Sequence, residues 1–265
     1  MRFQSCSLLL VGAILVGCGG AERLPVDGPE RARALVDSAL ARAGGVEGLN
    51  AVRTLAVQFD YTQYPQPSRG ETDTLISDVM QARDFDQGRA FYQTISKNPD
   101  REAHERVVMQ PGSGFVHDYV TGETRGLNPQ MQDMATVSEF QLRWYPYTHL
   151  TAAITAGPNL AFAGDTTIEN VPLEGVQFTS EMGDETLWID PATYELRRRV
   201  VNIPDQLQGQ RTVVYTYRDY GPFASIPFAQ LITVAQDGNL VARYDLLQLY
   251  VNPELQEEVF APPVP

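Results

Sequence analysis

Apolar and polar residues alternate along most of the chain after residue 54, which is the pattern of strands that bury one face. The first clear case is the series Leu55, Val57, Phe59 and Tyr61. The same pattern predicts strands over residues 74–83, 89–96, 102–110, 114–119, 160–163, 176–181, 185–189, 195–202, 211–220, 228–235 and 240–251. The intervening turns are short, so the strands should pair antiparallel, and a sheet of this many strands must curl or close.

The N-terminal part of the chain carries a helical pattern instead. Within residues 29–43 apolar side chains recur at the spacing of one helix face, Pro29 suits the first turn, and Gly44 and Gly45 suit its end. A short second helix is predicted over residues 46–52. This switch from helical to strand periodicity opens the long β region.

A second helical segment interrupts the strands in the middle of the chain. Asn128 can cap and Pro129 can open a helix that reaches about residue 145, and after a break at Pro146 another helical turn or two is expected over residues 148–156. The segment is too apolar for a free surface, so it should pack into the concave side of the sheet. The predicted fold class is therefore mainly β (α+β), a curved antiparallel sheet with helices packed in its concave face.

The first residues form an export signal. Arg2 precedes an apolar run over residues 8–16, which is too short to cross a bilayer and ends in Leu15-Val16-Gly17-Cys18. This end resembles the lipobox of bacterial lipoproteins, which implies that residues 1–17 are removed and Cys18 is acylated. Residues 18–28 would then be a lipidated N-terminus with a short linker, and residues 29–265 the folded domain. The alternative is an ordinary secretory signal in which Cys18 is incidental.

The net charge limits the classes of partner, and the cysteine content limits how the domain can be stabilised. The formal net charge is −13, and loss of Arg2 with the signal would make it −14. Such a surface repels phosphate backbones, so nucleic acid is not expected as a partner. Cys6 lies in the signal and Cys18 would carry the lipid, so the exported domain has no disulfide and must be stabilised by burial.

Two stretches resemble a known family. The first is Ala43-Gly44-Gly45-Val46-Glu47-Gly48-Leu49 followed by Val52-Arg53-Thr54-Leu55, and the second is Leu187-Trp188-Ile189-Asp190-Pro191-Ala192-Thr193 with the tail residues 249–253 and 259–263. Together they resemble the LolA/LolB-like (outer-membrane lipoprotein-sorting) superfamily. The resemblance implies an unclosed antiparallel β-barrel whose mouth is plugged by helices, and a cavity that binds acyl chains of a lipid or lipoprotein.

The lipidated Cys18 sets this chain apart from a soluble carrier. It makes the chain more similar to a membrane-anchored acceptor or another lipid-binding relative, and Gly19 after the cysteine is associated with delivery to the outer membrane. We expect a lipid-anchored envelope protein that faces the periplasm, wherever the organism has two membranes. No functional position of the characterised carriers can be aligned onto this sequence.

One apolar cluster is the candidate ligand-binding lining. It combines flexible methionines with broad aromatic rings, which suits a surface that accepts variable alkyl chains. Its members are Met131, Met134, Val137, Phe140, Trp144 and Tyr145. The alternative is that this cluster fills the core between helix and sheet, and the volume of the cavity separates the two interpretations.

The remaining chemistry-bearing residues give no catalytic or metal motif. His104, His117 and His149 are far apart, without the spacing of common zinc sites, and are expected at the surface or in caps. Gly112-Ser113-Gly114 lacks the spacing of a nucleophile elbow and is expected to be a hairpin turn. In Arg197-Arg198-Arg199, alternation would turn Arg198 toward the cavity, where it could bind a headgroup, unless the strand is solvated or salt-bridged.

The sequence therefore favours a non-enzymatic, anchored binding protein for acyl chains, expected as a monomer without metal or cofactor. A second hypothesis is a non-catalytic envelope interaction module with a filled barrel, which would bind a partner through its outer face or an edge strand. A third, an enzyme, would require histidines or acidic residues to converge in a pocket.

Overall fold

The structure is a computed structural model that describes residues 28–66, 70–127, 146–205, 209–223 and 226–263. Cys18 and the cluster Met131, Met134, Val137, Phe140, Trp144 and Tyr145 lie outside the described residues. The described helices are α1 (Gly28–Arg42), α2 (Gly45–Asn50) and α4 (Pro146–Thr155), with 3-10 turns η2 (Gly157–Asn159) and η3 (Glu257–Val259).

The strands cover most of the rest of the chain. They are β1 (Thr54–Gln63), β2 (Leu75–Asp84), β3 (Arg89–Ser96), β4 (His104–Gln110), β5 (Ser113–Asp118), β6 (Thr124–Gly126), β7 (Ala161–Ile168), β8 (Val171–Ser180), β9 (Gly183–Ile189), β10 (Leu196–Asp205), β11 (Gly209–Phe223), β12 (Ile226–Gln236) and β13 (Asn239–Val251).

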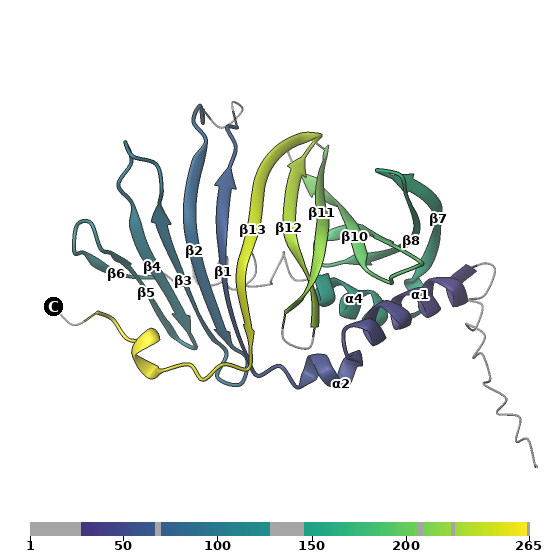
Figure 1. Cartoon of the computed structure of the whole chain (residues 1–265), viewed down its shortest axis with the longest axis horizontal. Coiled ribbons are helices and arrows are strands. Elements are labelled where there is room, and N and C mark those ends of the chain that lie inside the picture. The colour runs from purple at the N-terminus through teal and green to yellow at the C-terminus, as the bar shows by residue number, and fades with distance from the viewer. Residues whose placement is uncertain (1–27, 67–69, 128–145, 206–208, 224–225, 264–265) are drawn as a thin grey trace, which may run out of the picture.

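The thirteen strands found in the described residues belong to one curved antiparallel sheet. Their order is β6-β5-β4-β3-β2-β1-β13-β12-β11-β10-β9-β8-β7, so pairing of β1 with β13 joins the two halves of the chain. The sheet bends strongly, with β6 and β7 at opposite ends (Figure 1), and these two strands do not pair with each other in the described part of the chain. The predicted fold class, an unclosed β-barrel, is confirmed.

Helix α1 packs one apolar stripe against the sheet. Leu35, Val36, Ala39 and Leu40 are buried in one core with residues of α4 and the sheet, and α1 contacts α4, β7 and β8. The helix ends where predicted, because Gly44 adopts a left-handed backbone (φ 92°) that side chains with a Cβ rarely adopt.

The short helix α4 starts two residues earlier than expected, and the chemistry of proline explains this start. The sequence analysis placed a break at Pro146 and a helical turn over residues 148–156, whereas α4 starts at Pro146 itself. Proline suits the first helical position because its missing N–H would be unpaired there. The predicted helix over residues 129–145 lies outside the described residues.

Most predicted strands are present, and the hairpin between β7 and β8 is longer than expected. Glu169 and Asn170 both have positive φ (54° and 66°) and form its two-residue turn. Asn-Gly and Asp-Gly are the usual signals for such a turn. The pair Glu169-Asn170 therefore did not predict it. The Asp237-Gly238 turn between β12 and β13 was predicted and is confirmed, with φ of 50° and 83°.

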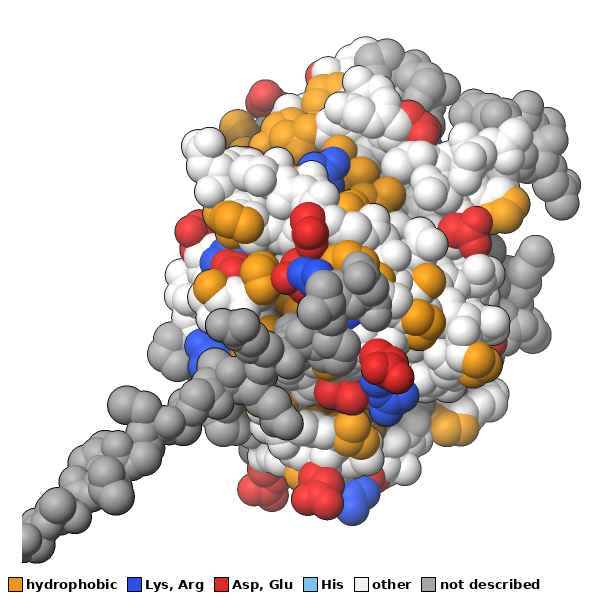
Figure 2. Space-filling view, turned by 90° about the vertical axis from the view of Figure 1, so that its right-hand side faces the viewer, with side chains coloured by type: hydrophobic (Ala, Val, Ile, Leu, Met, Phe, Trp, Pro, Cys, Tyr) orange, Lys and Arg blue, Asp and Glu red, His pale blue; other side chains and the backbone are white. Residues whose placement is uncertain are grey.

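At the end of the sheet near α1, charged groups form local pairs. Acidic and basic side chains lie among apolar ones on this side of the molecule (Figure 2). Arg31 of α1 donates to Glu174 at 2.6 Å and reaches Asp165 at 3.5 Å, which ties the helix to β7 and β8. No helix among the described residues has the length and apolarity needed to cross a bilayer.

After β13 the chain turns back across the outer face of the sheet. We call residues 253–263 the C-terminal strap. Phe260 of the strap lies in a second core with Phe91 and other residues of β2–β5. Arg89 donates two hydrogen bonds to Glu257 (2.6 and 2.7 Å) and lies 4.1 Å from the ring centre of Phe260. The hydrogen bonds from Arg89 lower the pKa of the Glu257 carboxyl.

Candidate functional site

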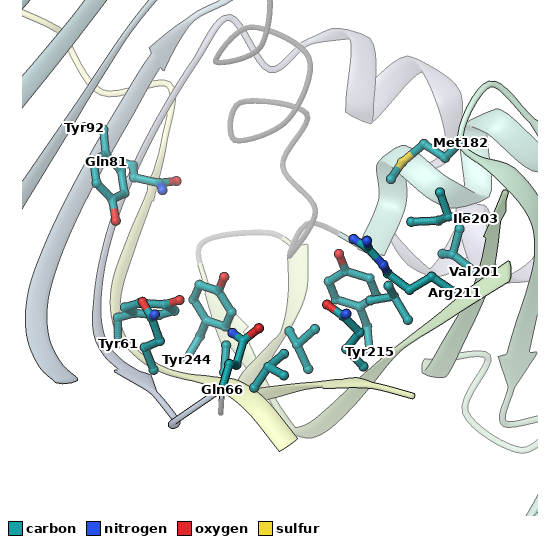
Figure 3. A pocket seen from close by; sticks show the side chains of 16 residues that line it. Tyr61, Gln66, Gln81, Tyr92, Met182, Val201, Ile203, Arg211, Tyr215 and Tyr244 are labelled. Atoms are coloured by element: carbon teal, nitrogen blue, oxygen red, sulfur yellow. The ribbon is translucent and has the colours of Figure 1, made fainter. Parts of the chain in front are cut away.

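A cavity of about 530 Å³ opens on the concave face of the sheet. Residues from both halves of the sheet line it, and their side chains point into the same space (Figure 3). Its lining comprises Tyr61, Gln63, Gln66, Gln81, Tyr92, Met182, Val201, Ile203, Arg211, Val213, Tyr215, Val234, Gln236, Val241, Ala242 and Tyr244. The cavity is therefore amphipathic rather than uniformly apolar.

One wall, formed by β1–β3 and β13, presents aromatic rings and amides. Tyr61 and Tyr244 are partners across β1 and β13, and their ring centres are 5.0 Å apart. Gln81 and Tyr92 are partners across β2 and β3. Gln81 occupies an inward position that alternation would assign to an apolar side chain, and only 9% of it is exposed. This wall offers hydroxyl and amide groups to a ligand.

The facing wall, formed by β10 and β11, is largely aliphatic. Val201 and Ile203 of β10 pair with Val213 and Arg211 of β11, and all four line the cavity. Figure 3 shows Met182, Val201 and Ile203 on the opposite side of the cavity from Tyr61 and Tyr92. A ligand between the two walls would meet apolar groups on one side and hydrogen-bonding groups on the other.

A buried ion pair lies beside the aliphatic wall. Nε of Arg199 donates to Oε2 of Glu185 at 2.6 Å, and the hydroxyl of Ser180 donates to Oε1 of the same carboxylate at 2.5 Å. Arg199 is 0% exposed and Glu185 is 3% exposed. Burial alone would lower the pKa of Arg199, but the hydrogen bond and charge of Glu185 outweigh it and hold that pKa above its ordinary value.

The orientation predicted for the three arginines is wrong. Arg199 lies opposite Tyr215 on the inner face, whereas Arg198 lies opposite Trp188 and Thr216 on the other face. The cause is a bulge between Leu196 and Arg198, which shifts the alternation by one residue. Simple alternation from the start of the strand therefore assigned the inner face to the wrong arginine.

The histidines are more buried than expected, and they bring no ligand set together. His117 and His149 are buried instead of lying at the surface. The rings of His104 and His117 both contact Tyr119, with ring centres 4.2 and 4.5 Å away. Within the described ranges, no group of three or more His, Cys, Asp or Glu side chains could hold a metal ion. The predicted turn at Gly112 is confirmed, between β4 and β5.

The cavity lining was not predicted from the sequence. Its residues are spread from Tyr61 to Tyr244, and only strand pairing brings them together. One usable signal was present: Gln81 and Tyr92 stand at inward positions of strands whose alternation predicts buried side chains. Polar groups at such positions indicate that the inner face is not a uniformly apolar core, because burying a polar group is favourable only where it has hydrogen-bond partners.

A half-open antiparallel sheet with a cavity on its concave face is an architecture that solved structures share. No protein-family model and no curated protein matches the chain. A domain described as an outer membrane lipoprotein-sorting protein, from Vibrio parahaemolyticus, matches with a TM-score of 0.52 and 11% identity over 88% of this chain and 97% of that one.

Two further structures match over similar lengths. A DUF1329 family protein from Desulfovibrio piger gives a TM-score of 0.52 and 10% identity, over 87% of this chain and 97% of that one. A LolA superfamily protein from Nitrosomonas europaea gives a TM-score of 0.48 and 11% identity, over 86% and 97%. The chain thus has the fold of the outer-membrane lipoprotein-sorting domains, and the resemblance predicted from the sequence is confirmed for the fold.

Proposed function

We propose that this chain is a non-enzymatic binding protein that holds the acyl part of a lipid or lipoprotein in the concave cavity. The observation that supports it is an open cavity of about 530 Å³ with one aliphatic wall. A filled barrel would instead have its concave face packed with its own side chains. Small-molecule sites span roughly 300–1,000 Å³. The cavity favours a binding protein over an interaction module with a filled barrel.

The driving force for such a ligand is burial of its methylene groups. Each buried methylene contributes roughly 0.8 kcal/mol, so a chain of moderate length binds without any covalent or metal chemistry. Part of that energy is offset by ordering the ligand and the side chains around it. The lipoprotein-sorting description of a structural neighbour is consistent with this class of ligand.

Filling the cavity should abolish binding while the fold is retained. Ala242 lines the cavity and is nearly buried, so Ala242→Phe places a ring in the space that the acyl chain would occupy. We expect at least a tenfold loss of affinity for a fluorescent fatty acid, measured by titration. Leu240→Phe, on the same strand but exposed and outside the cavity lining, is the control. Equal binding by both variants would place the ligand elsewhere.

The proposal includes an anchor at Cys18 that keeps the protein on the periplasmic side of an envelope membrane. Two acyl chains attach a protein stably, whereas one holds it only marginally. We expect Cys18→Ala to release the chain into the soluble fraction after export. Metabolic labelling with a palmitate analogue should mark the wild-type protein and not the Cys18→Ala variant. Labelling of the Cys18→Ala variant, or its retention in the membrane, would contradict lipidation at this residue.

A further inference from the structure

The cavity lining is rich in polar side chains but nearly free of charge. Four tyrosines and four glutamines contribute to it, whereas no Asp or Glu among the described residues does, although the chain has 33 acidic residues. Arg211 is the one basic side chain in the described lining, and it already interacts with another group of the chain. An acyl chain alone would need none of these polar groups, so the lining indicates a ligand that also has an uncharged polar part.

The hydrogen-bonding character of the lining favours hydroxyl groups over charged groups. A tyrosine hydroxyl and a glutamine amide both donate and accept hydrogen bonds, and each can bond to more than one partner. A carboxylate only accepts and an ammonium group only donates, so either of them would leave part of this surface unmatched. A sugar hydroxyl both donates and accepts, as the lining does.

One part of the wall combines two aromatic rings with open space. The rings of Tyr61 and Tyr244 lie 5.0 Å apart, and Tyr244 also packs edge-to-face on Phe59 with ring centres 5.2 Å apart. The next inward positions on the two strands are Gln63 of β1 and Ala242 of β13, which pair with each other. The small side chain of Ala242 leaves room between the two tyrosines and Gln63.

Two glutamines lie on either side of Ala242. Gln63 donates from Nε2 to Glu71 at 3.0 Å, which orients the amide and uses one of its two N–H donors. Gln236 of β12 stands one inward position beyond Val234, the residue that pairs with Ala242. Because β13 lies between β1 and β12, the two amides border the same space from opposite sides. Figure 3 shows the tyrosine rings pointing into this space.

We propose that the cavity binds a lipid with an uncharged, hydroxyl-rich headgroup such as a sugar, which packs on Tyr61 and Tyr244 and bonds to Gln63 and Gln236. This inference rests on the proposed acyl-chain binding and names the headgroup class of that ligand. The faces of a sugar ring carry C–H groups that pack on aromatic rings, while its hydroxyls match the amides at the edge. The acyl chain lies along the aliphatic β10–β11 wall.

The test compares ligands that share one chain length and differ in headgroup. Full-length protein carrying Cys18→Ala, which removes any acyl chains of its own, is titrated calorimetrically with decyl glucoside, decanoate and 1-decanol, each below the concentration at which it forms micelles, and with glucose. We expect decyl glucoside to bind at least about tenfold more tightly than decanol or decanoate, the effect of one or two additional neutral hydrogen bonds.

Three variants locate the headgroup on the proposed wall. Gln63→Leu, Gln236→Leu and Tyr61→Leu should each reduce the preference for decyl glucoside over decanol at least about threefold. Gln210→Leu is the matched control, because it makes the same substitution on β11 at an exposed residue outside the cavity lining and should keep the preference. Retention of the full preference in all three variants would overturn the inference.

The ligand series separates failure of this inference from failure of the proposed function. Equal binding of decyl glucoside and decanol, or tighter binding of decanoate, would overturn the headgroup inference and leave acyl-chain binding standing. Binding of none of the four would overturn both. Glucose that binds as tightly as decyl glucoside would support the hydroxyl-binding wall and contradict acyl-chain binding, since the ligand would then be a free sugar.

Discussion

Replacing Arg199 alone by methionine should lower the free energy of unfolding by about 3–5 kcal/mol, the cost of leaving one member of a buried ion pair without its partner. Glu185 would remain 3% exposed with only the Ser180 hydroxyl donating to it among the described side chains. Urea unfolding followed by circular dichroism measures the loss. We expect the midpoint to shift without a change in slope.

The double variant Arg199→Met/Glu185→Met distinguishes the charge from the packing. Replacing both members of a buried pair by apolar groups is often neutral or stabilising, so the double variant should recover most of the lost stability. Arg33→Met provides the single control, because the ion pair of Arg33 with Asp37 at 3.0 Å is about half exposed on both sides and worth at most about 1 kcal/mol. Equal losses in the single and double variants would show that arginine packing, not charge, stabilises this region.

The same pair is an arrangement that contributes little to stability compared with a well-packed apolar pair. A methionine or leucine pair would fill the volume next to Met182 and Tyr215 without any buried charge. The ion pair instead fixes the guanidinium in one orientation beside the cavity, with one donor edge unused by the described residues.

Strand alternation predicted the sheet well where each strand is regular. In β1 the buried side chains are Leu55, Val57 and Phe59, as the pattern required. Strand alternation failed in β10, because the pattern of apolar and polar residues does not reveal a β-bulge. One such bulge was enough to exchange the faces of Arg198 and Arg199.

The site was harder to predict than the fold, because its residues meet only through the order of the strands. Tyr61 and Tyr244 become neighbours when β13 pairs with β1, a contact between the first and last strands of the chain. Sequence analysis found the apolar cluster over residues 131–145 because those side chains are close in sequence. The cavity lining could not be found in the same way, because each of many strands contributes only a few residues to it and these are not consecutive in sequence.

The C-terminal strap was not predicted, although residues 249–253 and 259–263 were among those that carry the family resemblance. Asn252 adopts a positive φ (56°), and its side-chain oxygen accepts a hydrogen bond from the backbone N–H of Arg53 at 2.6 Å. The Asn-Pro pair therefore redirects the chain, as turn chemistry predicts. Which surface the redirected segment covers depends on apolar residues on the outer face of β2–β5, which alternation had assigned to solvent.

Removing the ring of Phe260 should be as costly as a core truncation, although only five residues follow Phe260 in the sequence. The side chain is 3% exposed, packs edge-to-face on Phe91 with ring centres 6.4 Å apart, and lies under the guanidinium of Arg89. Truncation of a buried phenylalanine to alanine costs about 3–5 kcal/mol. Phe260→Ala should therefore destabilise the protein by that amount in urea unfolding, and should increase binding of a hydrophobic dye to the uncovered outer face.

Phe85→Ala is the matched control, since it makes the same substitution at a ring that is 38% exposed and contacts Arg83 instead of the strap. Its cost should be smaller than that of Phe260→Ala, because more than a third of the Phe85 ring stays exposed to water in the folded protein. A loss in Phe260→Ala no larger than in Phe85→Ala would show that the strap rests on the sheet without stabilising it. The larger loss would show that the strap stabilises the outer face of the sheet, on which Phe260 is buried with Phe91.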